Sequence, residues 1–411
     1  MVRMKSSCTP PPMNKLSPLL LFILAFSGVA SAAVAGHQTR TIEGWTVQID
    51  DRLMTTDKAG TEKSLVILAA QLKEVARVVP AGPVARLRKV TLWFSPPYPN
   101  APPVGEYHPS AAWLSQNGRN PAMAKGIEFT NVRIFEAETQ RMPSLVLHEL
   151  AHAYHDQVLG YDNAEIKAAY ERAVASKSYD LVERRNGPCR PNNTFERAYA
   201  MNHVQEYFTE TSEAFFGHND FFPFTRDELT RHDPTMAALL QRLWQVTAPL
   251  PAPAPPPAPP TAGSPFNANC YYRLTTQWRG DDMSLDILYD GKSNNVPILA
   301  RTRNVDGQMW KLTPVANGAY RLTTQWRGEG LSLAITAGNR PLLVNSVTAP
   351  EQAWKLTPLG NGFYRMTTQA QGDGMSLDIV NDGGANNIPI LAKTGNFSGQ
   401  MWKVVPVALY P

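Results

Sequence analysis

The sequence predicts a multidomain protein, with an α+β domain followed by an all-β domain of pseudo-threefold symmetry. Its 411 residues exceed the length of one typical domain. The segment "APLPAPAPPPAPPTAGSP" is half proline, so it cannot form a helix or a central strand and divides the chain. A sequence that occurs three times follows it. We therefore expect the first domain at 36–247, a proline-rich linker at 248–265 and the second domain at 266–411.

Residues 1–35 have the organisation of a secretory signal peptide. Lys5 and Lys15 precede the apolar run "LLLFILAF", and the small-residue stretch "VASAAVA" follows it. The apolar run is shorter than the roughly 20 residues of a membrane-spanning helix, so we expect cleavage and no stable membrane insertion. The sequence thus predicts a secreted protein, extracellular or periplasmic.

The mature chain is expected to be nearly neutral. The leader holds 3 of the 39 basic residues and none of the 35 acidic ones, which leaves 36 basic against 35 acidic residues. A net charge of +1 gives no support for a nucleic-acid partner, and we expect none. Cys189 and Cys270 remain after cleavage; in an oxidising compartment they could pair, or they could be two unrelated loop cysteines.

The first domain is expected to open with strands and a helix. The stretch 41–54, "TIEGWTVQIDDRLM", alternates like a strand, 61–80 has a helical pattern, and 88–94, "RKVTLWF", is strand-like. Residues 125–135, "KGIEFTNVRIF", alternate again and predict a strand before the next helix. Our hypothesis is that this last strand is an edge that holds an extended substrate by backbone pairing.

The helix predicted at 144–156, "SLVLHELAHAYHD", carries a candidate metal site. His148 and His152 are four residues apart, so they lie one above the other and can share a Zn²⁺ at roughly 2.0–2.1 Å from each nitrogen. Glu149 projects beside them, where its carboxylate can take a proton from metal-bound water. The flanking leucine, valine and alanine residues predict a buried helix, in which these three polar side chains would be costly without a metal.

The third ligand is expected from a second helix. In the metzincin class a glycine and a histidine follow the second histidine by three and six residues, and His155 and Val158 at these positions exclude that class. The helical stretch 197–217, "RAYAMNHVQEYFTETSEAFFG", instead presents three carboxylates on one face, at Glu206, Glu210 and Glu213. One of them would complete three protein ligands and leave the fourth position open, as in catalytic zinc sites.

This second helix resembles that of the anthrax-lethal-factor-type zincins, which carry an "E-[FY]-F-x-E" segment; here the segment is "EYFTE". The resemblance implies Glu206 as the zinc ligand, Tyr199 as the donor to the tetrahedral oxyanion, and Glu210 as the acceptor for a ligand histidine N–H. It covers only the two helices and their order, so Glu210 stays open as the ligand and a distinct gluzincin-like family is equally compatible. We expect His155 and His203 to be structural.

These residues together predict a secreted zinc metallopeptidase of the gluzincin type, with one Zn²⁺ per chain. Its expected partners are a peptide or protein substrate, cleaved by metal-activated water. One alternative is a carbohydrate-binding adhesin whose zincin-like domain no longer catalyses. Another is a zinc hydrolase that acts on a different amide.

The C-terminal block consists of three similar repeats. The sequence "YRLTTQWRG" at 272–280 returns unchanged at 320–328 and as "YRMTTQAQG" at 364–372, and each copy ends on Gln-x-Trp. Repeats of 44 to 48 residues with short alternating strands predict all-β packing of threefold pseudosymmetry. The block resembles the ricin-B-type β-trefoil lectins, and the resemblance implies that the tryptophans of these motifs form the core: Trp310, Trp354 and Trp402.

The resemblance also implies glycan pockets in repeats one and three. Both repeats keep an aspartate in the motif "SLDI", whereas repeat two has Ala334 and a loop four residues shorter. The implied carbohydrate-binding residues are Asp286, Asn295, Gln308, Asp378, Asn387 and Gln400. The aromatic residue that stacks on the sugar in these lectins is replaced by Ala300 and Ala392, so a spacer or protein-binding module is the alternative.

Overall fold

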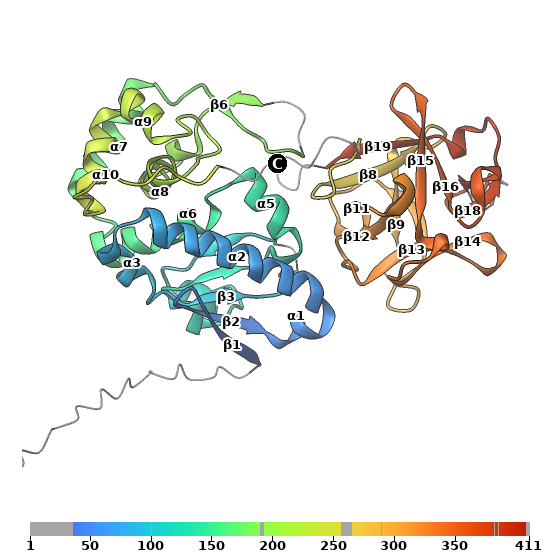
Figure 1. Cartoon of the computed structure of the whole chain (residues 1–411), viewed down its shortest axis with the longest axis horizontal. Coiled ribbons are helices and arrows are strands. Elements are labelled where there is room, and N and C mark those ends of the chain that lie inside the picture. Colours follow the sequence, from blue (N-terminus) through green and yellow to red (C-terminus); the bar gives the residue numbers. More distant parts are fainter. Residues whose placement is uncertain are drawn as a thin grey trace, which may run out of the picture. The chain divides into compact units, whose positions relative to one another are not determined.

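The computed structural model describes residues 36–99, 101–189, 193–255, 265–288, 290–381, 383–384 and 386–407. The expected signal peptide and residues 256–264 of the expected linker lie outside these ranges. The described chain has an N-terminal region of mixed helices and strands and a C-terminal β-trefoil-like barrel (Figure 1). Among the described helices, none is both long enough and apolar enough to cross a membrane.

A mixed five-stranded sheet organises the N-terminal region. Its order is β1-β2-β3-β5-β4; β2, β3 and β5 are parallel, and the two outer strands are antiparallel to their neighbours. The central strands β3 and β5 are buried along their whole length, as is usual for parallel strands. The strands are β1 (His37–Ile42), β2 (Trp45–Asp50), β3 (Leu92–Phe94), β4 (Gly105–Tyr107) and β5 (Ile127–Phe129).

The stretch 41–54 is not one strand but the end of a hairpin and the start of a helix. Glu43 and Gly44 both have positive φ angles, 51° and 90°, and form the turn between β1 and β2. Two successive positive φ angles are typical of hairpin turns whose twist matches that of the strands. Helix α1 (Asp51–Thr56) then begins at an N-cap in which Asp50 accepts a hydrogen bond from the Arg52 N–H.

The prediction of a substrate-binding edge strand at 125–135 was wrong. Only β5 is extended, because Asn131 leaves the strand conformation (φ −91°, ψ 25°) and a 3₁₀ turn, Val132–Ile134, follows. Moreover, β5 lies between β3 and β4, so its backbone groups are used inside the sheet. The edge strand next to β5 is β4, which the sequence pattern did not reveal; the opposite edge of the sheet is β1.

The helices α6 (Leu145–Tyr154) and α8 (Val204–Phe216) pack against each other in the core. Nine of the ten residues of α6 are buried, as the apolar flanks of its histidines predicted. Trp244 helps to hold the two helices together, since its ring stacks 4.1 Å from that of Tyr154 on α6 and its Nε1 donates to Ser212 Oγ on α8. The other helices are α2 (Lys58–Val78), α3 (Ala81–Leu87), α4 (Ala111–Gln116), α5 (Phe135–Arg141), α7 (Ala164–Ser176), α9 (Arg226–His232) and α10 (Pro234–Leu243).

The C-terminal barrel repeats one strand pattern three times. Its strands follow the order β10-β9-β8-β11-β12-β15-β16-β19, and pairing of β8 with β19 closes the sheet. Each repeat contributes a hairpin: β9–β10, β13–β14 and β17–β18. The strands are β8 (Tyr271–Thr276), β9 (Gly280–Ile287), β10 (Pro297–Arg301), β11 (Trp310–Pro314), β12 (Tyr320–Thr324), β13 (Leu331–Thr336), β14 (Arg340–Asn345), β15 (Trp354–Gly360), β16 (Phe363–Thr368), β17 (Met375–Ile379), β18 (Pro389–Lys393) and β19 (Trp402–Pro406).

The three repeat tryptophans occupy equivalent positions in the barrel core. Trp310, Trp354 and Trp402 are fully buried, and each indole Nε1 donates to a leucine carbonyl oxygen 2.8 Å away. Their expected core role is confirmed. Phe266, just before the first repeat, packs against the first tyrosine of all three copies, with ring centroids 5.5, 5.4 and 5.1 Å apart: Tyr272, Tyr320 and Tyr364.

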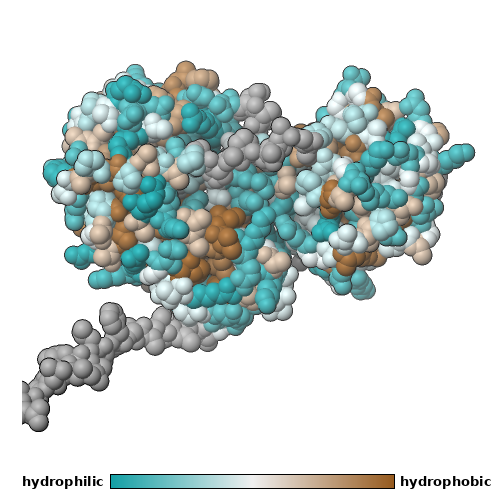
Figure 2. All heavy atoms as spheres, viewed as in Figure 1, coloured by the Kyte–Doolittle hydropathy of each residue, from teal (hydrophilic) through white to brown (hydrophobic). Residues whose placement is uncertain are grey.

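Two further features complete the fold. Cys189 and Cys270 form a disulfide, so of the two alternatives for these cysteines the structure has the paired one. Cys189 follows β6 (Val182–Arg184), which forms a small hairpin with β7 (Thr194–Glu196), and Cys270 directly precedes β8. The face shown in Figure 2 carries small groups of hydrophobic residues among hydrophilic ones, as is usual for a water-exposed surface.

Candidate metal centre and trefoil pockets

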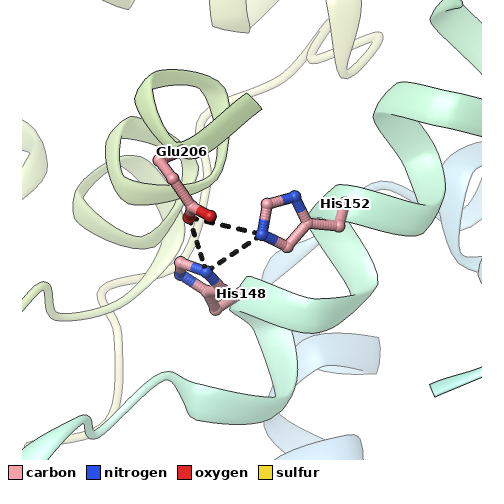
Figure 3. A group of neighbouring side chains, drawn as sticks. All are labelled: His148, His152 and Glu206. Atoms are coloured by element: carbon pink, nitrogen blue, oxygen red, sulfur yellow. Dashed lines mark hydrogen bonds and ion pairs between the residues drawn. The ribbon is translucent and has the colours of Figure 1, made fainter. Parts of the chain in front are cut away.

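Helices α6 and α8 bring His148, His152 and Glu206 together, as the spacing of these residues predicted (Figure 3). Glu206 Oε2 lies 3.1 Å from His148 Nε2 and 3.3 Å from His152 Nε2, and the two Nε2 atoms are 3.2 Å apart. Ligand atoms at 2.0–2.1 Å from a tetrahedral Zn²⁺ are about 3.3 Å from one another. The two imidazoles and the carboxylate therefore fit a zinc ion in both chemistry and spacing.

Glu213, rather than Glu210, lies within hydrogen-bonding distance of His148. The Nδ1 atom of this histidine is 2.6 Å from Glu213 Oε1 and 3.8 Å from Glu210 Oε1. On an α-helix seven residues turn about 20° short of two full turns, whereas four residues turn about 40° past one, so Glu213 lies more nearly in line with Glu206. A carboxylate that accepts the Nδ1–H leaves the Nε2 lone pair of His148 free to bind a metal.

Burial and neighbouring side chains together set the pKa values of the three carboxylates on α8. Burial opposes ionisation of Glu206, yet hydrogen bonds from His148 and His152 outweigh it and lower its pKa. Burial and the neighbouring Glu213 raise the pKa of Glu210 well above its ordinary value. Burial also raises the pKa of Glu213 to about 7, against the effect of His148. Glu206 is thus the carboxylate held as an anion, the form that ligates a metal.

Glu149 is held beside the three candidate metal ligands by strand β4. Its side chain is 5% exposed, and its Oε2 accepts a hydrogen bond of 2.9 Å from the backbone N–H of Tyr107 in β4. Burial raises the pKa of Glu149 to about 8, with His148 opposing this effect. A carboxyl group that titrates near neutral pH is suited to accept and return a proton. The role of β4 in holding this carboxylate has no signal in the sequence.

A cleft of about 470 Å³ opens over the three ligands and Glu149. Tyr199 from the 3₁₀ turn Tyr199–Met201 lines it and is 44% exposed, so its hydroxyl can reach a ligand in the cleft. Two other wall residues were not expected there. His203 is 3.6 Å from Glu206 Oε1, although we expected it to be structural, and Tyr161 lies on the loop after the metal-site helix.

His155, in contrast, is a core residue as expected. It is fully buried, and its ring packs edge-on against Tyr161 and at a tilt against Phe208, with centroids 5.0 and 4.8 Å apart. Burial lowers its pKa to about 4, so the ring is neutral at physiological pH. It supports the cleft wall from behind.

A second histidine and carboxylate group lies at β4 and β5. Glu106, His108 and Glu128 have their ligand atoms close together, but the buried Glu128 already accepts hydrogen bonds from His108 (3.0 Å) and Tyr98 (2.9 Å). Arg119 pairs with both carboxylates. These contacts already occupy both carboxylates and His108 within the protein, so the group is a structural network beside the cleft.

In the trefoil, the predicted pocket residues of repeats one and three form matching pairs. Gln308 Nε2 donates to Asp286 Oδ2 and to a backbone carbonyl, and Gln400 makes the same two bonds, to Asp378 and the backbone; all four distances are 2.9 Å. Both glutamines are buried. Their amide hydrogens are used within the protein, which leaves the half-buried aspartates as the groups that can meet a ligand.

The other two predicted residues lie where neighbouring repeats meet. The backbone carbonyl of Asn295 accepts from Leu343 N–H in repeat two, and that of Asn387 accepts from Leu299 N–H in repeat one, at 2.9 and 2.8 Å. The side-chain Oδ1 atoms of both asparagines are buried. The structure therefore brings each glutamine to its aspartate and places the asparagines at the contacts between repeats.

The C-terminal part of the chain matches a known family. Residues 306–393 match the model described as "Ricin-type beta-trefoil lectin domain-like". This segment contains the second repeat and parts of the other two, and it supports a ricin-B-type β-trefoil lectin domain at residues 306–393, as the repeats predicted. No curated protein matches the chain.

The solved structures that match part of the chain share only low sequence identity with it. A designed threefold-symmetric protein, ThreeFoil, is 22% identical over 33% of this chain and 99% of its own, with a TM-score of 0.29. The earthworm R-type lectin C-half in complex with GalNAc is 14% identical over 34% and 99%, with a TM-score of 0.26. The Macrolepiota procera ricin B-like lectin in complex with lactose is 18% identical over 35% and 98%, with a TM-score of 0.28.

Proposed function

We propose that this chain is a secreted zinc-dependent endopeptidase of the gluzincin type whose trefoil binds glycans. The observation that carries the proposal is the spacing of His148, His152 and Glu206, whose ligand atoms are 3.1–3.3 Å apart with the buried Glu149 beside them. A Zn²⁺ held by these three residues would act as a Lewis acid that lowers the pKa of water to about 7. The remaining chemistry belongs to the side chains around it.

Glu149 and Tyr199 have complementary roles in the proposed reaction. Glu149 accepts a proton from the attacking water at its carboxylate and later gives it to the leaving amine. Tyr199 donates its hydroxyl proton in a hydrogen bond to the oxyanion that develops on the scissile carbonyl. Its exposure at the cleft wall and the position of Glu149 under the cleft agree with these roles.

The edge strand β4 suits an extended peptide. Val104 and His108, on either side of β4, hydrogen-bond to the β5 side. In an antiparallel pair the bonding direction alternates, so Gly105 and Tyr107 turn their backbone groups towards the open edge. The Tyr107 N–H is used by Glu149, and the groups of Gly105 are the ones that a substrate strand would pair with.

Metal analysis and peptide cleavage test this proposal together. We expect one zinc per purified chain, and cleavage of peptides in a proteome digest that stops with a chelator and returns with Zn²⁺. The sequences of the released peptides would define the scissile bond. Absence of bound zinc, or cleavage that continues in the chelator, would reject the zinc mechanism.

The family match favours a second candidate, a carbohydrate-binding adhesin whose N-terminal domain does not catalyse. Both candidates predict glycan binding by the trefoil. On a glycan array, the double variant Asp286→Ala with Asp378→Ala is expected to lose the binding of the unmodified chain. Unchanged glycan binding by this variant would reject both proposed pockets. If the unmodified chain binds glycans but holds no zinc and cleaves no peptide, the adhesin is the better description.

A further inference from the structure

We propose that the third repeat holds the principal glycan site of this chain and that Phe397 is its aromatic platform. The inference rests on the proposed glycan binding by the trefoil and specifies where it occurs. Phe397 lies in the loop between β18 and the Gln-x-Trp motif and is 60% exposed. Contact between the apolar ring of an exposed phenylalanine and water is unfavourable, and a ligand that covers the ring removes this cost.

A glycine in the same loop, Gly395, lies against the ring of Phe397. A Cβ atom added to Gly395 would lie 2.3 Å from Phe397 Cε2, so the aromatic ring rests directly on the glycine backbone. Any side chain at position 395 would push the ring away. The glycine therefore supports one face of the ring and leaves part of it open to solvent.

Hydrogen bonds connect Gly395, on which the ring rests, with the aspartate of the same repeat. The Gly395 N–H donates to Gln400 Oε1, and Gln400 Nε2 donates to Asp378 Oδ2, both at 2.9 Å. Arg365 Nη2 donates to the Gly395 carbonyl at 2.8 Å. Two hydrogen bonds thus connect the glycine under Phe397, in the loop after β18, with the half-buried carboxylate of Asp378 on β17.

An aromatic face and a carboxylate in the same repeat, linked through Gln400, match the chemistry of a pyranose. The apolar C–H face of such a sugar packs on an aromatic ring, while its hydroxyl groups donate to a carboxylate oxygen. Asp378 Oδ1 and Oδ2 each accept one bond from the protein, from the Ile379 N–H and from Gln400, and an ionised carboxylate has further lone pairs. The expected ligand is a pyranoside with one apolar face and a free hydroxyl.

The other repeats lack this combination among the described residues. Repeat one has the same aspartate–glutamine pair, but Arg303 stands in the place of Gly395 and Val305 in the place of Phe397. Repeat two has Ala334 in the place of the aspartate and Ala349 in the place of the phenylalanine.

The test compares Phe397→Ala with the matched variant Val305→Ala in repeat one. On an array of immobilised mono- and oligosaccharides, and in titrations with the glycan that binds best, Phe397→Ala is expected to weaken binding at least about tenfold. Val305→Ala is expected to leave the glycan affinity unchanged. Phe397→Tyr, which keeps an aromatic ring, is expected to retain the affinity of the unmodified chain. Tryptophan fluorescence and thermal unfolding check that the barrel is intact in each variant.

The outcomes separate this inference from the function on which it rests. If the unmodified chain binds no glycan, the proposed lectin function fails and the inference with it. If the chain binds glycan and Phe397→Ala binds equally well, the platform is rejected while the lectin function stands. Loss of binding in Val305→Ala or Asp286→Ala, but not in the third-repeat variants, would assign the site to repeat one.

Discussion

Replacing Glu149 by glutamine is expected to reduce peptide cleavage by at least about 10²-fold and to leave zinc binding in place. An amide of the same size cannot accept the proton of the attacking water, and general acid–base catalysis contributes typically ~10²–10⁴ in rate. Zinc should remain because Glu149 is not one of the three residues whose ligand atoms converge. The measurement is kcat/KM for a peptide found in the digest, together with the zinc content of the variant.

Glu106→Gln is the matched control for this substitution. Glu106 lines the same cleft and lies next to Tyr107 in β4, but its carboxylate is paired with Arg119. Its replacement should therefore change cleavage far less than Glu149→Gln does. A Glu149→Gln variant with full activity would remove this residue from the mechanism, and a variant without zinc would mean that the glutamate shapes the site instead.

The grouping of the candidate metal ligands could be predicted to the extent that it depends on helix geometry. Spacing of four residues aligns His148 with His152 whatever the rest of the fold, and one carboxylate on a second buried helix is enough to complete the group. The edge strand could not be predicted, because β4 has only three residues and no alternating pattern that distinguishes it from a loop. Its contact with Glu149 depends on how the sheet meets α6.

The trefoil was predictable for a different reason. Three copies of one sequence must form three copies of one structure, so the core tryptophans are evident from the repeat itself. The hydrogen bonds within each repeat are not evident from it. Gln308 was implied as a sugar contact, yet its amide is used by Asp286 and the backbone, and Gly307 is small because a Cβ there would lie 2.3 Å from the Asp286 carboxylate.

Repeat two supports this explanation. It has Ala334 in place of the aspartate and Glu351 in place of the glycine, so the carboxylate and the glycine that accommodates it are lost together. Gln352 is retained and accepts a hydrogen bond from the Ser332 hydroxyl instead. The glutamine of the motif is therefore used by the fold in all three repeats, and the aspartate is what distinguishes repeats one and three from repeat two.

Replacing Glu213 by alanine is expected to weaken zinc binding about 10- to 100-fold, the usual effect of removing a group that orients a ligand histidine. The substitution leaves His148 Nδ1 without its 2.6 Å partner, so the imidazole loses both its fixed orientation and the neighbouring charge. Zinc affinity is measured by competition with a chelator of known affinity. Glu213→Gln keeps an oxygen that accepts the N–H bond and is expected to restore part of the affinity.

Glu210→Ala is the matched control, because it removes the same atoms from a side chain that is equally buried on the same helix. Glu210 lies 3.8 Å from His148 Nδ1, and burial together with Glu213 raises its pKa and so disfavours its anionic form. It is therefore expected to matter less for the metal. Thermal unfolding of the zinc-free variants separates loss of metal binding from loss of the fold. If Glu210→Ala weakens zinc binding as much as Glu213→Ala, or more, then Glu210 is the residue that orients His148, and the distances of 2.6 and 3.8 Å do not reflect the arrangement in the zinc-bound protein.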